Sequence, residues 1–137
     1  MQAQRILETV LYAENLDDTA AFYERVLQLQ PRAREAGRHV FFRCGEGMFL
    51  LFNPKNTESH QVIIGGAEVP LHGSHGPGHV AFRMAEAEIP AWRAWLGEQG
   101  VHIESEVTWP QGGHSLYFRD PAGNVVELAT PRIWGLT

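Results

Sequence analysis

The chain has 137 residues, of which 44% are hydrophobic and 20% are charged, and its formal net charge at pH 7 is −5. These values are typical of one globular domain and argue against a nucleic-acid partner, because no run of Lys or Arg occurs in the chain. The single cysteine, Cys44, excludes a disulfide within the chain and favours a reducing, cytoplasmic location. Neither a signal peptide nor an apolar run of 18 residues is found, so we expect no membrane segment.

A strand followed by a helix is predicted at the start of the chain. Residues 5–13 (RILETVLYA) are rich in β-branched and apolar side chains, which favours a strand. Residues 14–29 place apolar side chains at helical spacing, with Asp17 as the expected N-cap. We expect Pro31 to end this helix.

Two strands and a long loop are predicted next. Residues 38–44 (RHVFFRC) and 47–53 (GMFLLFN) favour strands, joined by a tight turn at Gly45-Glu46-Gly47. Residues 53–78 contain many Gly and Pro residues and predict a loop.

The second half of the chain repeats this order. Residues 78–84 (GHVAFRM) predict a strand, and residues 88–100 predict a helix that has Pro90 near its first turn and Gly100 just past its end. Three further strands are expected at residues 101–107, 114–119 and 124–130. The last two would form a hairpin around the turn residues 120–124, DPAGN.

The two halves match at fixed offsets. Glu8 and His79 begin the two copies, 71 residues apart, and the motif Phe-Arg recurs 76 residues later in the second copy. At the second offset Leu51 is expected to be the counterpart of Glu127.

We therefore predict an α+β fold of two tandem βαβββ modules that form a curved mixed sheet around a cup-shaped site. Module one would cover about residues 1–60 and module two about residues 75–137, within a single domain spanning 1–137.

Three ionisable residues, Glu8, His79 and Glu127, interrupt apolar strands at repeat-related positions. Two carboxylates and an imidazole that converge in a partly dry cup would repel unless they are protonated or bridged by a cation. A lone Glu or His in a strand is more often solvated, ion-paired or packed. Three at related positions favour a divalent metal, and three protein ligands leave coordination positions open for a substrate.

Three segments carry a resemblance to a known family: ILETVLYAENLDDTAAFYERVLQL, GPGHVAFRM and SLYFRDPAGNVVELATP. They resemble the vicinal oxygen chelate superfamily, which contains glyoxalase I, extradiol dioxygenases, fosfomycin-resistance thiol transferases and bleomycin-binding proteins. The resemblance covers nearly the whole chain and implies that Glu8, His79 and Glu127 hold a metal. Glyoxalase-type members draw a fourth ligand from the last strand of the first module, where this chain has Leu51, so three protein ligands are implied.

The ligand set bears on the choice of metal. Extradiol dioxygenases and fosfomycin-resistance enzymes usually have His where this chain has Glu8, and the iron pattern is two His and one carboxylate. One His with two carboxylates favours Mn, Mg, Ni or Zn and leaves Fe open. Leu51, at the position of the fourth glyoxalase ligand, argues against glyoxalase chemistry. Glu8, at the position of a His in the dioxygenases, argues against dioxygenase chemistry. Fosfomycin resistance ranks lower, because only Arg119 and Arg132 flank the last motif.

Further side chains are expected to face the same cup. Strand alternation places Tyr12 with Glu8 and Arg83 with His79, and the resemblance adds Ser115 and Tyr117. The candidate substrate-binding residues are Tyr12, Arg83, His114, Ser115 and Tyr117, and the candidate catalytic residues are Glu8, Glu127 and Tyr117. The alternatives are that Tyr117 is only an aromatic of the sheet and that His114 is a solvated loop residue.

The sequence predicts a metal-dependent enzyme, with glyoxalase-like lyase or isomerase chemistry or dioxygenase-like chemistry, that acts on a small substrate with vicinal oxygens. Apolar helix stripes and the resemblance favour a homodimer. The alternative is a non-catalytic small-molecule or drug-binding protein of the bleomycin-resistance type. The sequence leaves open the substrate, the metal, the reaction type and whether modules swap between chains.

Overall fold

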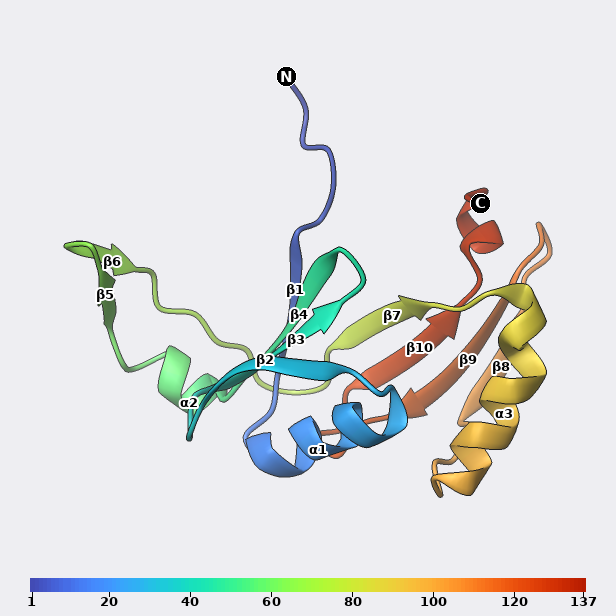
Figure 1. Ribbon diagram of the computed structural model, residues 1–137, viewed down its shortest axis with the longest axis horizontal. Helices are drawn as coiled ribbons and strands as arrows, with labels where there is room; N and C mark the ends of the chain where they lie inside the picture. Colours follow the sequence, from blue (N-terminus) through green and yellow to red (C-terminus); the bar gives the residue numbers. More distant parts are fainter. The chain divides into compact units, whose positions relative to one another are not determined.

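Each half of the chain folds around its own four-stranded sheet (Figure 1). The structure is a computed structural model that describes residues 1–137, and it divides into two units, Met1–Gly76 and Pro77–Thr137. No helix has the length and the hydrophobicity that crossing a membrane requires.

The first unit has the order strand, helix and three strands, followed by a small hairpin. Its elements are β1 (Glu8–Tyr12), α1 (Leu16–Val26), β2 (Gln30–Glu35), β3 (His39–Cys44), β4 (Gly47–Phe52), α2 (Pro54–Thr57), β5 (Val62–Ile64) and β6 (Ala67–Val69). The sheet order is β1-β4-β3-β2, with β1 parallel to β4 and the other pairs antiparallel. Strands β5 and β6 form a separate two-stranded ribbon.

The second unit repeats the same order without the hairpin. Its elements are β7 (His79–Arg83), a 3-10 turn (Glu86–Glu88), α3 (Ile89–Glu98), β8 (Ser105–Thr108), β9 (His114–Arg119), β10 (Val125–Ala129) and a second 3-10 turn (Pro131–Trp134). The sheet order is β7-β10-β9-β8, and only β7 and β10 are parallel. The predicted tandem βαβββ fold is therefore confirmed. The strand pairing gives two four-stranded sheets, one in each module.

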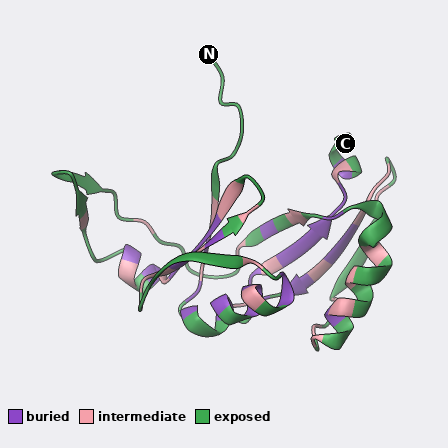
Figure 2. Ribbon diagram, viewed as in Figure 1, coloured by how far each residue is buried: buried purple, intermediate pink, exposed green.

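Burial alternates from residue to residue along strands such as β3 and β7 (Figure 2), so each sheet has one buried face and one more open face. In the first unit Tyr23 of α1 packs on Phe49, with ring centroids 4.7 Å apart, and Phe42 lies 6.0 Å from the same ring. In the second unit Leu96 of α3 and Phe118 of β9 are fully buried. The apolar faces form the cores, so polar side chains that alternate with them lie on the open faces.

Three local expectations about the first unit were wrong. The loop predicted at residues 53–78 contains helix α2 and the hairpin β5–β6. Helix α1 begins at Leu16 with Asn15 as its N-cap, rather than with Asp17. Pro31 does not end the helix, which stops at Val26; it lies inside β2. Strand β2 is at the edge of its sheet, where a residue without a backbone N–H is tolerated.

The strand register corrects the repeat by one residue. Glu127 pairs with Tyr117, and the corresponding pair in the first sheet is Leu50 with Phe41. Leu50, rather than Leu51, is therefore the counterpart of Glu127. Five residues lie between the paired Arg119 and Val125, against four between the corresponding pair Arg43 and Met48, and a shift of one residue moves a side chain to the other face.

Candidate functional site

His79 and Glu127 face each other on the open side of the second sheet. Their strands β7 and β10 are parallel neighbours, and His79 Nε2 lies 3.1 Å from Glu127 Oε2. The Glu127 side chain is only 7% exposed, whereas the His79 side chain is 51% exposed. The pair thus has a buried carboxylate under an accessible imidazole.

The backbone determines which nitrogen of His79 faces the carboxylate. His79 Nδ1 lies 3.1 Å from the carbonyl oxygen of Val125, which can only accept, so Nδ1 carries the hydrogen. In the neutral ring Nε2 then presents a lone pair to a carboxylate oxygen. Two lone pairs at this distance require a proton or a cation between or beside them.

A chain of hydrogen-bond donors ends on the Glu127 carboxylate. The Ser115 hydroxyl donates to Glu127 Oε1 at 2.5 Å, and Trp109 Nε1 donates to Ser115 Oγ at 2.9 Å. Ser115 is fully buried. This chain of donors holds one carboxylate oxygen in place and leaves Oε2 directed to His79.

Tyr117 lies beside the pair as a neutral hydroxyl. The centroid of its ring lies 6.3 Å from that of the His79 ring, with an angle of 29° between the ring planes. Burial raises the pKa of Tyr117, and the negative charge of Glu127 raises this pKa further. Tyr117 therefore keeps its proton at neutral pH and can donate a hydrogen bond.

The turn DPAGN positions the two strands relative to each other. The Asp120 carboxylate accepts hydrogen bonds from the backbone N–H groups of Ala122 and Asn124, each at 2.9 Å. The Asn124 side chain in turn accepts from the backbone N–H of Gly78 at 2.7 Å. The turn therefore fixes the residue immediately before His79.

His79 and Glu127 fit the chemistry of metal ligands. A metal-bound His almost always donates its second N–H to a carbonyl or carboxylate, as His79 does to Val125. Two ligand atoms at a right angle, each about 2.1 Å from a metal, lie about 3 Å apart. Within the second unit, no third His, Cys, Asp or Glu side chain joins the pair to complete a set of three.

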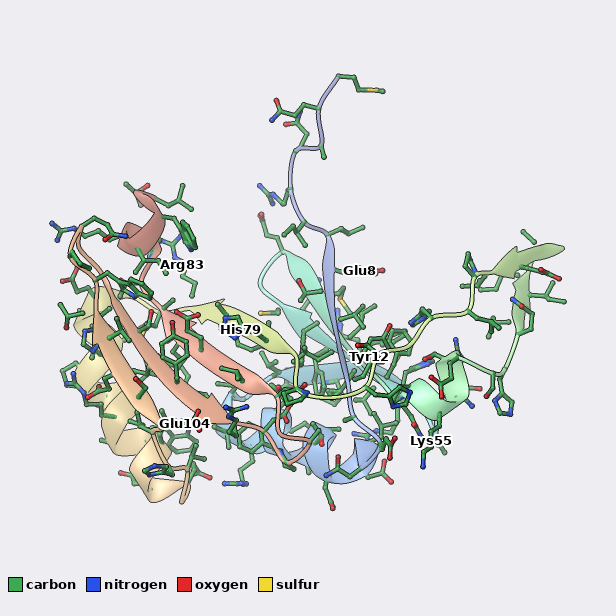
Figure 3. The ribbon with its side chains drawn as sticks, turned by 180° about the vertical axis from the view of Figure 1, so that it is seen from behind. Glu8, Tyr12, Lys55, His79, Arg83 and Glu104 are labelled. Carbon is green, nitrogen blue, oxygen red and sulfur yellow. The ribbon has the colours of Figure 1, made fainter.

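Glu8 and Tyr12 belong to the first unit, on strand β1 (Figure 3). Glu8 pairs with Met48 as His79 pairs with Val125, so Glu8 and His79 occupy the same place in their respective sheets. Both Glu8 and Tyr12 line a cavity on the open face of the first sheet.

Arg83 and His114 lie on different faces of the second sheet. Arg83, Ala129 and Ser115 form one row across β7, β10 and β9, so Arg83 shares the open face. His114 is adjacent to Ser115 and faces the opposite side, where its Nε2 lies 3.5 Å from Arg93 of α3 and 3.6 Å from Glu106. The predicted place of His114 at the rim of the cup does not fit this orientation.

Sequence reasoning missed the residues that support the site. Trp109 carried no recognisable signal, because its partner Ser115 is brought close by the loop at Gly112 and Gly113. A Cβ on Gly113 would lie 2.5 Å from the Ile133 side chain, so the close packing of this loop requires glycine.

Comparisons with known proteins cover both units of the chain. The family model described as the Glyoxalase/Bleomycin resistance protein/Dioxygenase superfamily matches residues 5–128. The metallothiol transferase FosB of Bacillus licheniformis is 27% identical over 121 residues, which are 88% of this chain and 71% of that protein.

Solved structures with the same fold include two further proteins. The crystal structure of lactoylglutathione lyase from Agrobacterium tumefaciens has a TM-score of 0.92 and 36% sequence identity, covering 99% of this chain and 100% of that chain. The fosfomycin resistance protein FosX of Listeria monocytogenes has a TM-score of 0.67 at 19% identity, covering 93% and 91% of the two chains.

Proposed function

Because the chain belongs to the glyoxalase/bleomycin resistance protein/dioxygenase superfamily, we propose that it is a metal-dependent enzyme acting on a small substrate with two vicinal oxygens. The proposed metal ligands are Glu8, His79 and Glu127. The observation that carries the proposal is the 3.1 Å approach of His79 Nε2 to the buried Glu127 carboxylate, whose negative charge requires a cationic partner. A bound divalent ion would supply Lewis-acid polarisation of a substrate oxygen.

The residues around the pair have distinct proposed roles. Glu127, whose Oε1 is already occupied by Ser115, is a proton acceptor through Oε2, and Glu8 is the second candidate. Tyr117 keeps its proton and is a donor to a substrate oxygen. Arg83 is exposed on the same face, where it can orient a substrate, and Ser115 acts by holding Glu127.

Lyase or isomerase chemistry is the first choice within this class. The lactoylglutathione lyase is 36% identical to this chain, compared with 27% for the metallothiol transferase. Dioxygenase-like chemistry and thiol transfer are the rivals. Mn, Ni, Zn, Mg and Fe are all candidates for the ion.

Metal binding by the purified protein tests the proposal. Isothermal titration with Mn²⁺, Ni²⁺, Zn²⁺, Mg²⁺ and Fe²⁺ should detect at least one ion with the wild type and a large loss of affinity with Glu127→Gln. The matched control is Glu104→Gln, which removes an exposed carboxylate that pairs with Arg119 at 3.1 Å in the same unit. Wild-type protein that retains none of these ions would refute the proposal.

A non-catalytic binding protein of the bleomycin-resistance type is the second candidate, and a homodimer is proposed in either case. The large cavity on the first sheet favours ligand binding. A ligand that raises the melting temperature equally in wild type and Glu127→Gln, without added metal, would support this candidate. Sedimentation equilibrium tests the homodimer, which a monomeric mass would exclude.

A further inference from the structure

The open face of the first sheet holds a cavity of about 770 Å³, a size that suits a small organic molecule. Every residue that lines it belongs to the first unit. Glu8, a proposed metal ligand, is among them, and so are the aromatic residues Tyr12 and Phe52. A substrate held at Glu8 would therefore extend over this surface.

Strand pairing orders the cavity lining into rows that follow Glu8. The rows, read across β1, β4 and β3, are Val10–Leu50–Phe41 and Tyr12–Phe52–His39. Side chains two residues apart on a strand share a face, so the surface changes from a carboxylate to an apolar row and then to an aromatic row. A rise of about 3.3 Å per residue makes the path from Glu8 to Tyr12 about 13 Å long.

The far end of this path is built from rings. His39 stacks on Phe41 with centroids 3.9 Å apart and an interplanar angle of 10°. Phe52 lies edge-on to Phe41 at 5.2 Å and to His72 at 4.8 Å. Such a cluster offers both faces and edges to a further planar ring.

The arginine at this end of the cavity is already paired. Arg38 is the only Lys or Arg that lines the cavity; it donates to Asn56 Oδ1 at 2.7 Å, and its Nε lies 3.6 Å from a Glu35 carboxylate oxygen. Burial lowers the pKa of His39, so this ring is neutral at physiological pH. The single arginine of the lining is therefore already engaged, and the carboxylates of Glu8 and Glu35 in the same lining disfavour an anionic group.

The hairpin β5–β6 supplies an outer wall through one of its faces. Val62, Ile64 and Val69 line the cavity, whereas Ile63, between Val62 and Ile64, does not. Ile63 and Ile64 are 64% and 67% exposed. Ile63 and Ile64 are therefore about equally exposed, but only the Ile64 side chain points toward the cavity.

We propose that this cavity binds the neutral, apolar body of the substrate and that the body ends in a planar aromatic group against the row of Tyr12, Phe52 and His39. The inference rests on the proposed function only for the position of the two chelating oxygens beside Glu8. It assigns substrate selectivity to the first sheet and to the hairpin β5–β6.

Four small probes separate the chelating head from the aromatic body. Acetohydroxamate carries only the chelating oxygens, and 2-naphthohydroxamic acid carries the oxygens and two rings. Naphthalene-2-methanol carries the rings with a neutral, non-chelating hydroxyl, and 2-naphthoate carries the rings with a negative charge. Their affinities are measured by isothermal titration, with and without Mn²⁺, on wild-type protein and on Ile64→Ala, Phe41→Leu and the control Ile63→Ala.

The expected result is that 2-naphthohydroxamic acid binds at least about tenfold tighter than acetohydroxamate with Mn²⁺ present, because it buries the rings. Naphthalene-2-methanol should bind without Mn²⁺ and more tightly than 2-naphthoate. Ile64→Ala and Phe41→Leu should weaken both ring-bearing neutral probes, and Ile63→Ala should not. Circular dichroism confirms that each variant is folded, and Ile64→Ala alters only an exposed side chain of the hairpin.

The inference is overturned if 2-naphthohydroxamic acid binds no tighter than acetohydroxamate, if 2-naphthoate is preferred over the alcohol, or if Ile63→Ala has the same effect as Ile64→Ala. The proposed metal function fails separately. If Mn²⁺ does not affect the hydroxamates but naphthalene-2-methanol binds and responds to Ile64→Ala, the cavity assignment stands and the metal site does not.

Discussion

Asn124 accepts a hydrogen bond from the backbone N–H of Gly78 at 2.7 Å, so the turn before strand β10 holds the residue before His79. Asn124 is 1% exposed, and its side-chain N–H donates to Asp120 at 2.9 Å. Replacing Asn124 with Ala leaves the Gly78 N–H and an Asp120 oxygen without these partners. We expect the free energy of unfolding to fall by roughly 2–3 kcal/mol.

Urea unfolding measures this change, with Gln111→Ala, a substitution in an exposed loop of the same unit, as the control. If the proposed metal site is correct, Asn124→Ala should also weaken metal binding in the folded protein, because His79 loses its anchor. Unchanged stability would show that the turn does not depend on this side chain.

Ser115→Ala is expected to destabilise the second unit. The substitution removes the buried Ser115 hydroxyl, which donates to Glu127 Oε1 and accepts from Trp109 Nε1. The cost should be about 2 kcal/mol. The matched control is Ser105→Ala, an exposed serine on β8 of the same sheet, which should change the free energy of unfolding by less than about 0.5 kcal/mol. Equal effects from the two serines would contradict the assigned role of Ser115.

Substitutions at Leu50 and Leu51 test the register of the repeat. Leu51 is fully buried in the core, whereas Leu50 lines the cavity. Leu51→Gln places an amide where no partner exists and should cost about 2 kcal/mol more than Leu50→Gln, whose amide can reach the cavity. Chemical denaturation compares the two variants, and the reverse order of stability would favour the original alignment of Leu51 with Glu127.

The segment before β7 should loosen as the pH rises. His75 Nε2 lies 2.8 Å from Glu58, and its Nδ1 lies 3.5 Å from Glu14, which also pairs with Lys55 at 3.4 Å. The pKa of His75 is raised, first by its hydrogen bond to Glu58 and then by the negative charge of Glu58. Glu14 raises this pKa further. A raised pKa means that this contribution is fully present below the ordinary value of about 6.5 and is lost as the pH rises through the folded-state pKa.

The His72 backbone N–H, which donates to the Thr57 carbonyl at 3.1 Å, reports this loosening. Its hydrogen-exchange protection factor should fall between pH 6 and pH 8 in the wild type. The variant His75→Gln keeps a hydrogen-bonding side chain but does not titrate, so its protection factor should be independent of pH in this range. A wild-type protection factor that is equally flat would exclude His75 as the cause.

The main elements could be predicted because their signals are local. The strands that begin at Glu8 and His79 and the two helices follow from side-chain periodicity. Strand β2 could not be predicted, since its sequence QPRARE is exposed throughout and is defined only by its pairing with β3. The hairpin β5–β6 did carry a signal, two short runs around Gly65-Gly66, whose positive φ angles fit a tight two-residue turn.

The candidate site could be predicted only in part. The sequence repeat predicted that Glu8 and His79 occupy equivalent positions. The strand pairing agrees, because Glu8 pairs with β4 at the position where His79 pairs with β10. The register at Glu127 was missed because one offset was applied across hairpins of unequal length. The aromatic row of the cavity depends on three strands that are distant in sequence, so no local pattern could indicate it.

The unequal hairpins have a consequence for how the two halves can diverge. In β10, Val126 and Leu128 lie in the core, and Glu127 lies between them on the open face. If the strand pairing adjusted to the loss of one residue from the turn at 120–124, these faces would be exchanged: the two apolar side chains would move to the open face and the acid would point into the apolar core. A single insertion or deletion, with no substitution in any strand, is therefore enough to create or erase an acidic position in a duplicated module.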